Sequence, residues 1–509
     1  MTDRLSDLPL FARRGPAAPP DPAAVPRSPL APGYPGRPGV PGHPSRTTYH
    51  VPPAGEIDWA LVRTFRQLAS QRLAEQLAHR LGVDEDDRRE LGRAIVRDLL
   101  DEHARSELEN GRPLLDPALE SGVAAAVFDS LFGLGRLQSL VDLADVENIE
   151  ITGHDRVILI YSDGRRELAP PVADSDEELV EFLAFLAARR GGSERSFSSA
   201  NPSLHLNLQG GHARLMAIME VSHRPVVRIR KHLIPRVSLG MLRELGTVDT
   251  VLEEFLGAVV RARKSIVVSG DQGSGKTTFV RALAGEIDPW ESLATLETEY
   301  ELFLHELPDR HRPPIALEAR PGSGELLADG RRAGAITLED MFEWVLRANL
   351  DRIIVGEVRG PEAMAMFKAM QSGAGSLCTT HAKSARDTIE RLVTCVVSAN
   401  GNEAFAARLV AQHVDVIVHL SARPDPATGR KRRMVDEVIQ VTTGEGHRPA
   451  ITDLFRPRPD GRAVPHTPPT FIDELAAVGF DPRLLDHRGG TWPPDGAPVP
   501  SLAALRGRP

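Results

Sequence analysis

The stretch that decides the fold is Gly270-Asp271-Gln272-Gly273-Ser274-Gly275-Lys276-Thr277. It fills every fixed position of a phosphate-binding P-loop. A short apolar, β-branched run at residues 265–269 predicts a buried strand before it, and residues 278–284 predict a helix after it, closed by Gly285. Strand, glycine-rich loop and helix are the context that this motif requires. The sequence therefore predicts a binding site for a nucleoside triphosphate.

The residues of this loop have separate expected roles. The glycines allow backbone N–H groups to converge on the phosphates, and the N-terminus of the helix adds a favourable dipole. Lys276 can reach the β- and γ-phosphates, and the Thr277 hydroxyl can bind Mg²⁺. No segment matches the Asn-Lys-x-Asp motif that reads guanine, so ATP is preferred over GTP. The predicted phosphate-binding residues are Gly270, Gly273, Ser274, Gly275, Lys276, Thr277 and Thr278.

Composition narrows the class of protein. A chain of 509 residues is long enough for about two to four domains. Its net charge of −9 provides no basic field to attract nucleic acid or anionic lipid. The two cysteines, Cys378 and Cys395, are too few for a metal cluster and favour buried thiols in a reducing compartment. No apolar stretch has the length of a membrane span and the N-terminus has no apolar signal core, so we expect a cytoplasmic protein.

Changes in composition divide the chain into five segments. The first is rich in Pro, Ala, Gly and Arg and is predicted to be a disordered tail. The second has apolar residues at three- and four-residue steps, which predicts helices, and the third mixes helix and strand patterns. The fourth alternates strands and helices, which is typical of a parallel α/β domain, and the fifth is a Pro-rich extension. The predicted boundaries are residues 1–54, 55–120, 121–235, 236–445 and 446–509.

Local patterns also predict individual elements. The helical region should include residues 61–68 and 91–100, and a last short helix is expected at residues 471–478. Alternating leucines followed by Gly210-Gly211 predict a hairpin in the mixed domain. The predicted strands of that domain are residues 149–152, 156–161, 204–208, 214–218 and 226–230.

Five further segments can be interpreted together. They are residues 147–153, 227–231, 296–302, 351–360 and 375–382. The last two are strand patterns that end in Glu357 and His381. With the P-loop, this set in this order resembles the type II/IV secretion ATPase superfamily over about residues 56–440. Within it, the chain is most similar to the CpaF-type branch, the motors of tight-adherence (Flp) pili.

The resemblance implies an α/β fold, with a RecA-like P-loop ATPase domain after a smaller mixed α/β N-terminal domain and with disordered Pro-rich tails. Glu357 matches the acid of the atypical Walker B strand. This acid would bind Mg²⁺ together with Thr277 and could also polarise the attacking water. Glu297 and Glu301 match the acidic box, and His381 matches the histidine box that senses the γ-phosphate. Thr298 replaces the usual Asp of the acidic box, which leaves the division of labour among its glutamates open.

Basic residues complete the implied site. Arg214, Arg230 and Arg320 match basic positions of the superfamily, and guanidinium groups can neutralise charge that develops on a transferred phosphoryl group. The alternative for each arginine is an ordinary surface position, and the alternative for each acidic-box glutamate is a structural ion pair. Asn349 stands where the superfamily often has a second arginine before the Walker B strand.

The expected function is an ATP-hydrolysing, homohexameric motor that powers pilus assembly or protein secretion across the inner membrane. It would use ATP and Mg²⁺, work on an inner-membrane platform protein from the cytoplasmic side, and hinge near residues 231–240. One alternative is a conjugation-type motor that translocates nucleic acid, which the acidic net charge and the lack of a basic, aromatic-interleaved stretch oppose. The other is a non-hydrolysing, ATP-dependent scaffold, which Glu357 and His381 oppose.

Overall fold

The computed structural model describes most of the chain beyond the N-terminal segment. The described residues are 57–78, 83–191, 197–208, 213–231, 233, 237–307, 310–320, 322, 326–328, 332–372, 375–425, 429–494 and 500. The tail predicted at residues 1–54 lies outside these ranges, and so do residues 232 and 234–236 of the predicted hinge.

The helical prediction for the region after residue 55 is confirmed. The helices are α1 (Trp59–Leu77), α2 (Glu85–Glu109) and α3 (Pro117–Phe132). The side chains of Asp58, Asp84 and Asp116 cap their N-termini by accepting backbone N–H groups. Within the described part of the chain, no one helix has both the length and the apolar character needed to cross a bilayer. Only α3 together with residues Gly135–Val141 meets these two criteria, and the two segments are bent by 109°.

A six-stranded antiparallel sheet follows, in the order β3-β2-β1-β6-β5-β4. Its strands are β1 (Val146–Thr152), β2 (Arg156–Tyr161), β3 (Arg166–Ala169), β4 (Ser203–Leu208), β5 (Ala213–Ile218) and β6 (Val226–Lys231). Leucines of α5 (Asp176–Gly191) pack on the apolar residues of this sheet. The predicted strands and the pairing of the hairpin are confirmed, and the pairing of β5 with β6 places Arg214 opposite Arg230.

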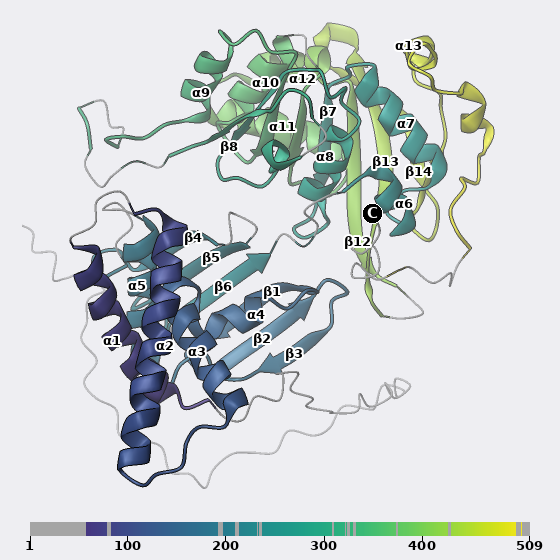
Figure 1. The fold of residues 1–509 in the computed structure, drawn as a ribbon. Helices are drawn as coiled ribbons and strands as arrows, with labels where there is room; N and C mark the ends of the chain where they lie inside the picture. The colour runs from purple at the N-terminus through teal and green to yellow at the C-terminus, as the bar shows by residue number, and fades with distance from the viewer. Residues whose placement is uncertain are drawn as a thin grey trace, which may run out of the picture. The chain divides into compact units, whose positions relative to one another are not determined.

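The larger sheet has nine strands, in the order β15-β14-β13-β12-β7-β11-β10-β8-β9. Neighbours from β12 to β9 run parallel, and the strands from β12 to β15 run antiparallel. The strands are β7 (Ile266–Gly270), β8 (Leu293–Glu297), β9 (Ile315–Glu318), β10 (Arg352–Val358), β11 (Leu377–Thr380), β12 (Val416–Pro424), β13 (Lys431–Thr443), β14 (Pro449–Pro457) and β15 (Ala463–Pro465). Figure 1 shows the long strands β12, β13 and β14 side by side.

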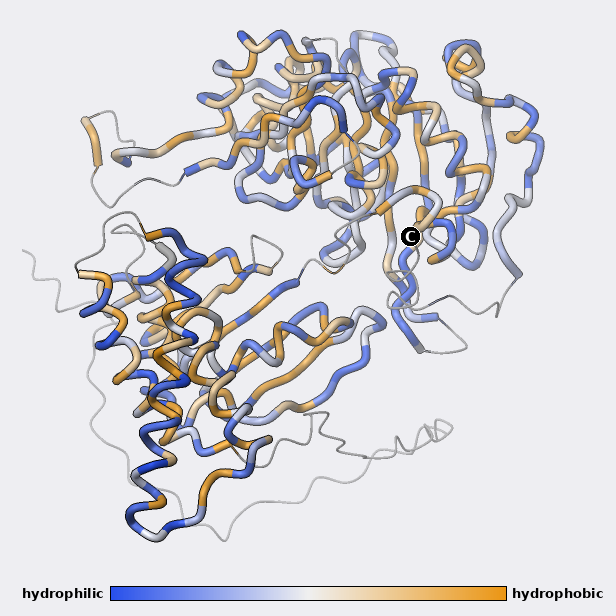
Figure 2. The backbone as a smooth tube through the Cα atoms, viewed as in Figure 1, coloured by the Kyte–Doolittle hydropathy of each residue, from blue (hydrophilic) through white to orange (hydrophobic). Residues whose placement is uncertain are grey.

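Helices cover both faces of the larger sheet. The alternation along β7 shows why, because Ile266 and Val268 join one apolar core while Val267 joins the other. The first core includes residues of α6 (Leu239–Glu244), α7 (Thr250–Arg261) and α8 (Lys276–Ala284). The second includes residues of α9 (Leu338–Val345), α10 (Ala363–Gln371), α11 (Ala385–Ser398) and α12 (Glu403–His413). Figure 2 shows apolar stretches along the strands that these helices cover.

The prediction of a disordered extension after residue 445 is wrong for its described part. Strands β14 and β15 continue the sheet, and α13 (Ile472–Ala477) confirms the short helix. Phe455, Phe480 and Trp492 are buried in the same core as α7. Prolines did not prevent strands here, because Pro449 and Pro457 lie at the two ends of β14 and Pro465 ends the edge strand β15, where a missing N–H is tolerated.

Candidate nucleotide-binding and catalytic site

The P-loop has the predicted strand, loop and helix around it. Strand β7 ends at Gly270 and α8 begins at Lys276. Gly275 caps the helix with φ of 95°, a left-handed conformation that favours glycine. Gly270 has φ of 149°, and a Cβ atom there would lie 2.2 Å from the carbonyl oxygen of Leu420. The two glycines are therefore required by backbone conformation and by close packing, and they leave the loop backbone open to a ligand.

Lys276 is almost fully buried at the centre of this loop, with 7% of its surface exposed. Its Nζ atom donates to the carbonyl oxygens of Gly270 and Asp271, both at 3.0 Å, and lies 3.2 Å from Nδ1 of His381. Burial is the main cause that lowers the pKa of Lys276 to about 8, and the charge of Arg230 adds to this effect. An anion beside Nζ would restore the charged form, which is the behaviour expected of a phosphate-binding lysine.

Glu357 and His381 meet at the ends of two adjacent parallel strands. In the register of β10 and β11, Glu357 lies opposite Thr379, two residues before His381. Glu357 Oε1 is 3.1 Å from Nε2 of His381, and Glu357 Oε2 accepts a 2.5 Å hydrogen bond from Arg359. Burial would raise the pKa of Glu357, but these two partners outweigh burial and lower the pKa to about 2. His381 thus connects an ionised carboxylate to Lys276.

A second set of contacts reaches the metal-binding position of the P-loop. The Thr277 hydroxyl donates to Glu301 Oε2 at 2.9 Å. Arg214 Nη1 lies 2.7 Å from Glu301 Oε1 and 2.7 Å from Glu299 Oε2, and its Nη2 donates to the carbonyl oxygen of Tyr300 at 2.6 Å. The structure thus brings Thr277, Glu301 and Arg214 together, and it pairs Thr277 with Glu301 rather than with Glu357.

Glu297 has a different position from the other acidic-box residues. It ends β8 with 1% of its surface exposed, and its Oε2 accepts the backbone N–H groups of Glu301 at 2.8 Å and Leu302 at 2.9 Å. Burial raises the pKa of Glu297 to about 7. Its carboxyl group therefore holds the backbone of the acidic loop, while Glu301 reaches the P-loop. This geometry separates the two residues that the sequence groups together.

The three predicted arginines also lie in different environments. Arg214 is engaged with the acidic loop as described. Arg230 is exposed, and it makes no ion pair with the residues that the structure describes. Its charge nevertheless acts on Lys276 and Lys431, which locates it near the loop. Arg320 is exposed and pairs its backbone with Ile336, so no contact links it to the P-loop, and its role stays a prediction.

Sequence reasoning missed a basic strand that borders the P-loop. Arg433 on β13 donates from Nε to the carbonyl oxygen of Gly273 at 3.0 Å. Its Nη2 donates to both carboxylate oxygens of Glu147, at 3.0 Å and 2.8 Å. The available signal was the run of basic residues at 430–433. Because this run is 160 residues from Gly273 in the chain, only the pairing of β12 with β13 and of β12 with β7 reveals its position.

The side chains present fit Mg²⁺ bound together with a triphosphate. Mg²⁺ prefers oxygen ligands and keeps several waters when it binds with substrate phosphates. Thr277 and Glu301 provide a hydroxyl and a carboxylate oxygen 2.9 Å apart, and these residues would hold the ion directly or through water. When bound, the ion would neutralise phosphate charge. Among the described residues, no cluster of three or more His, Cys, Asp or Glu side chains forms a metal site from protein alone.

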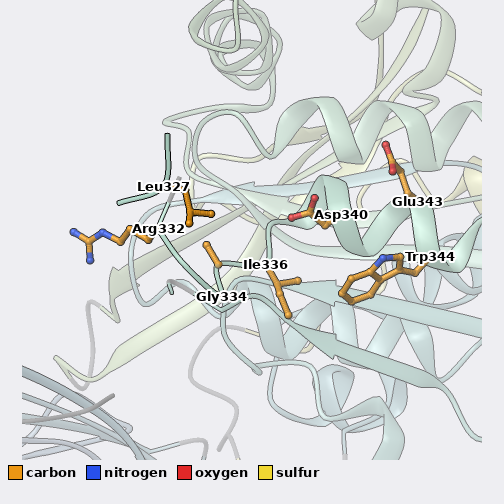
Figure 3. A pocket seen from close by; sticks show the side chains of 8 residues that line it. Leu327, Arg332, Gly334, Ile336, Asp340, Glu343 and Trp344 are labelled. Carbon is orange, nitrogen blue, oxygen red and sulfur yellow. The ribbon is translucent and has the colours of Figure 1, made fainter. Parts of the chain in front are cut away.

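One cavity of about 280 Å³ lies away from these residues (Figure 3). It is lined by Leu327, Arg332, Gly334, Ala335, Ile336, Asp340, Glu343 and Trp344. Its lining comes from α9 and the segment before it and includes no P-loop residue, so the chemistry described above is not located there. The two cysteines, also outside the site, are buried free thiols as predicted.

One protein family and several known proteins are similar to this chain. Residues 180–456, more than half of the chain, match the family described as type II/IV secretion system protein. A Mycobacterium tuberculosis protein named provisionally for conjugal transfer is 28% identical over 330 residues, which are 63% of this chain and 88% of that protein. The type IV secretion system protein PtlH of Bordetella pertussis is 34% identical over 189 residues, 36% of this chain and 52% of PtlH.

Among solved structures, the VirB11 ATPase of the Brucella suis type IV secretion system is 27% identical to this chain. The alignment covers 62% of this chain and 96% of the VirB11 chain, with a TM-score of 0.31. The family match spans β4 to β14 and so includes the P-loop, the acidic loop, Glu357 and His381. The chain belongs to the type II/IV secretion system protein family and is an ATPase.

Proposed function

We propose that this protein is a motor that hydrolyses Mg-ATP to power pilus assembly or protein secretion. The observation that carries the proposal is the contact series from Lys276 through His381 to the ionised carboxylate of Glu357. It joins a phosphate-binding lysine to a group that can orient or deprotonate water. A scaffold that only binds ATP would not require an acid kept ionised at this point.

In the proposed reaction, the P-loop backbone and Lys276 hold the triphosphate. Glu357 orients a water molecule whose oxygen attacks the γ-phosphorus, and the bond from that phosphorus to the β–γ bridging oxygen breaks. ADP and inorganic phosphate leave, and the proton of the water passes to Glu357 and then to solvent. Arg230 can neutralise charge on the transferred group, because it is a cation near the loop without a carboxylate partner among the described residues.

The finer parts of the proposal concern assembly and cargo. We propose a homohexamer that acts on an inner-membrane platform protein, in the manner of tight-adherence pilus motors, with a hinge near residues 231–240. Light scattering with and without ATP tests the hexamer, and copurification with a candidate platform protein tests the partner.

Lys276→Ala tests the catalytic proposal. It should abolish ATP turnover, because it removes the charge that binds the phosphates. It also removes two hydrogen bonds to carbonyl oxygens of the loop, so a thermal melt without nucleotide checks that the variant is folded. Lys264→Ala is the matched control, since Lys264 precedes the opposite end of β7 and pairs with Glu474. Turnover in Lys276→Ala equal to that of the control would contradict the site.

A second candidate function is transport of DNA, which the name of the Mycobacterium tuberculosis relative favours. The net charge of −9 opposes it. Measuring ATP hydrolysis with added single- or double-stranded DNA separates the two: strong, salt-sensitive stimulation would favour a DNA motor, and an unchanged rate would favour the secretion motor.

A further inference from the structure

The first residues of β13 form part of the wall of the P-loop. Arg433 binds the carbonyl oxygen of Gly273, and a Cβ atom on Gly275 would lie 3.4 Å from Cδ of Arg433. Lys431 lies two residues earlier on the same strand. Its Nζ atom is 3.0 Å from the position that a Cβ atom on Gly273 would occupy. The ammonium group of Lys431 therefore lies directly against the phosphate-binding loop.

The two basic residues differ in how their charges are compensated. Arg433 is neutralised by a two-oxygen ion pair with Glu147. Lys431 is only partly exposed, and within the described ranges no carboxylate or other acceptor binds its Nζ atom. Burial is the main cause that lowers the pKa of Lys431; the charges of Arg433 and Arg230 add to this effect, and the charge of Glu147, which is already paired with Arg433, opposes it. A half-buried ammonium group among other cations requires an anionic partner to be favourable.

We propose that Lys431 is a second lysine of the nucleotide site, which binds the β- or γ-phosphate beside Gly273. Arg433 positions it by fixing the start of β13 to the carbonyl oxygen of Gly273. The proposal rests on the proposed function, since it concerns the same nucleotide. It also gives a reason for glycine at position 273. A Cβ atom there would lie 3.0 Å from Nζ of Lys431 and would displace the ammonium group.

The test measures nucleotide affinity of the full chain by titration with ATP, ADP and AMP. Lys431→Met keeps the length of the side chain and removes its charge. We expect ATP affinity to fall about tenfold, which corresponds to about 1.4 kcal/mol, with AMP affinity unchanged because AMP lacks the β- and γ-phosphates. Lys431→Arg should retain most of the ATP affinity. Lys264→Met is the matched control, and a thermal melt without nucleotide checks that each variant is folded.

Each outcome decides the proposal. Equal ATP affinity in Lys431→Met and Lys264→Met overturns it, and so does an equal loss for ATP and AMP. If Lys431→Met does not fold, Lys431→Gln replaces it with the same expected losses. Wild-type protein that fails to bind ATP would overturn the proposed function as well, whereas wild-type binding that only Lys276→Ala weakens would overturn the role of Lys431 alone.

Discussion

Glu297→Gln is expected to stabilise the protein at pH 8 and to leave its stability unchanged near pH 4. Burial raises the pKa of Glu297 from 4.5 to about 7, so the folded state holds this proton more strongly than the unfolded chain. The stability that protonation contributes is complete below about pH 4.5 and is lost as the pH rises through about 7. At about 1.4 kcal/mol for each tenfold change in proton affinity, the loss is about 3 kcal/mol. Glutamine remains neutral and keeps an oxygen for the N–H groups of Glu301 and Leu302.

The assay is thermal or urea unfolding of both proteins without nucleotide, from pH 4 to pH 9. The difference in free energy of unfolding between variant and wild type should grow between about pH 4.5 and 7 and then level off. A difference that does not depend on pH, or a variant that is less stable than wild type at pH 8, would refute the reasoning. Either result would mean that folding does not raise the pKa of Glu297 above its value in the unfolded chain.

Replacing Glu357 by glutamine should lower turnover, whereas the same replacement of Glu297 should not. Glu357→Gln removes an ionised group from the catalytic position, so turnover should fall by about 10²-fold or more, about 2.7 kcal/mol, while ATP still binds. Glu297→Gln should keep most of the turnover, because it preserves the contacts that hold the acidic loop. Steady-state hydrolysis and nucleotide binding measured on both variants provide the comparison. Equal losses in the two would contradict the separate roles.

Other expectations follow from buried charges and from the tail. Glu291→Ala leaves the guanidinium of Arg352, which is 0% exposed, without its carboxylate, and should lower the free energy of unfolding by about 3–5 kcal/mol in urea titrations. Burial lowers the pKa of His419, but its hydrogen bond with Asp436 outweighs burial and raises the pKa overall. The contribution of protonated His419 to stability is therefore present below about pH 6.5 and is lost as the pH rises through the raised value. The difference in melting temperature between wild type and His419→Gln should shrink over that range. Deletion of residues 1–50, which are poor in core-forming residues, should leave the melting temperature and basal hydrolysis unchanged, and an insoluble product would contradict this.

Sequence patterns predicted those parts of the site that depend on local geometry. A strand followed by a glycine-rich loop and a helix allows few conformations, so the positions of Lys276 and Thr277 followed from the motif. Glu357 and His381 could be expected near each other because both end parallel strands, and the carboxyl ends of such strands meet at one edge. These predictions needed only the periodicity of apolar residues and the direction of the strands.

Contacts between distant segments could not be predicted in the same way. The pairing of Thr277 with Glu301 depends on the path of the acidic loop, which Glu297 fixes through backbone N–H groups. The approach of Arg433 to Gly273 depends on sheet order, which a single sequence does not reveal. The strands after residue 445 were missed for a related reason, since composition reports the number of prolines but not whether they lie at the ends of a strand.

Glu297 and Glu357 show how position decides the chemistry of one residue type. Both are glutamates near the carboxyl ends of adjacent parallel strands, β8 and β10, yet burial raises the pKa of Glu297 to about 7, while hydrogen bonds with His381 and Arg359 lower the pKa of Glu357 to about 2. The side chain of Glu297 lies under Gly356, where a Cβ atom would approach its Cγ to 3.0 Å. This glycine therefore provides the space in which Glu297 is buried, and the next residue, Glu357, reaches His381 and Arg359. A carboxyl group with a raised pKa that supports a loop and a carboxylate with a lowered pKa beside the P-loop lysine thus arise from neighbouring strand ends, because their burial and their hydrogen-bond partners differ.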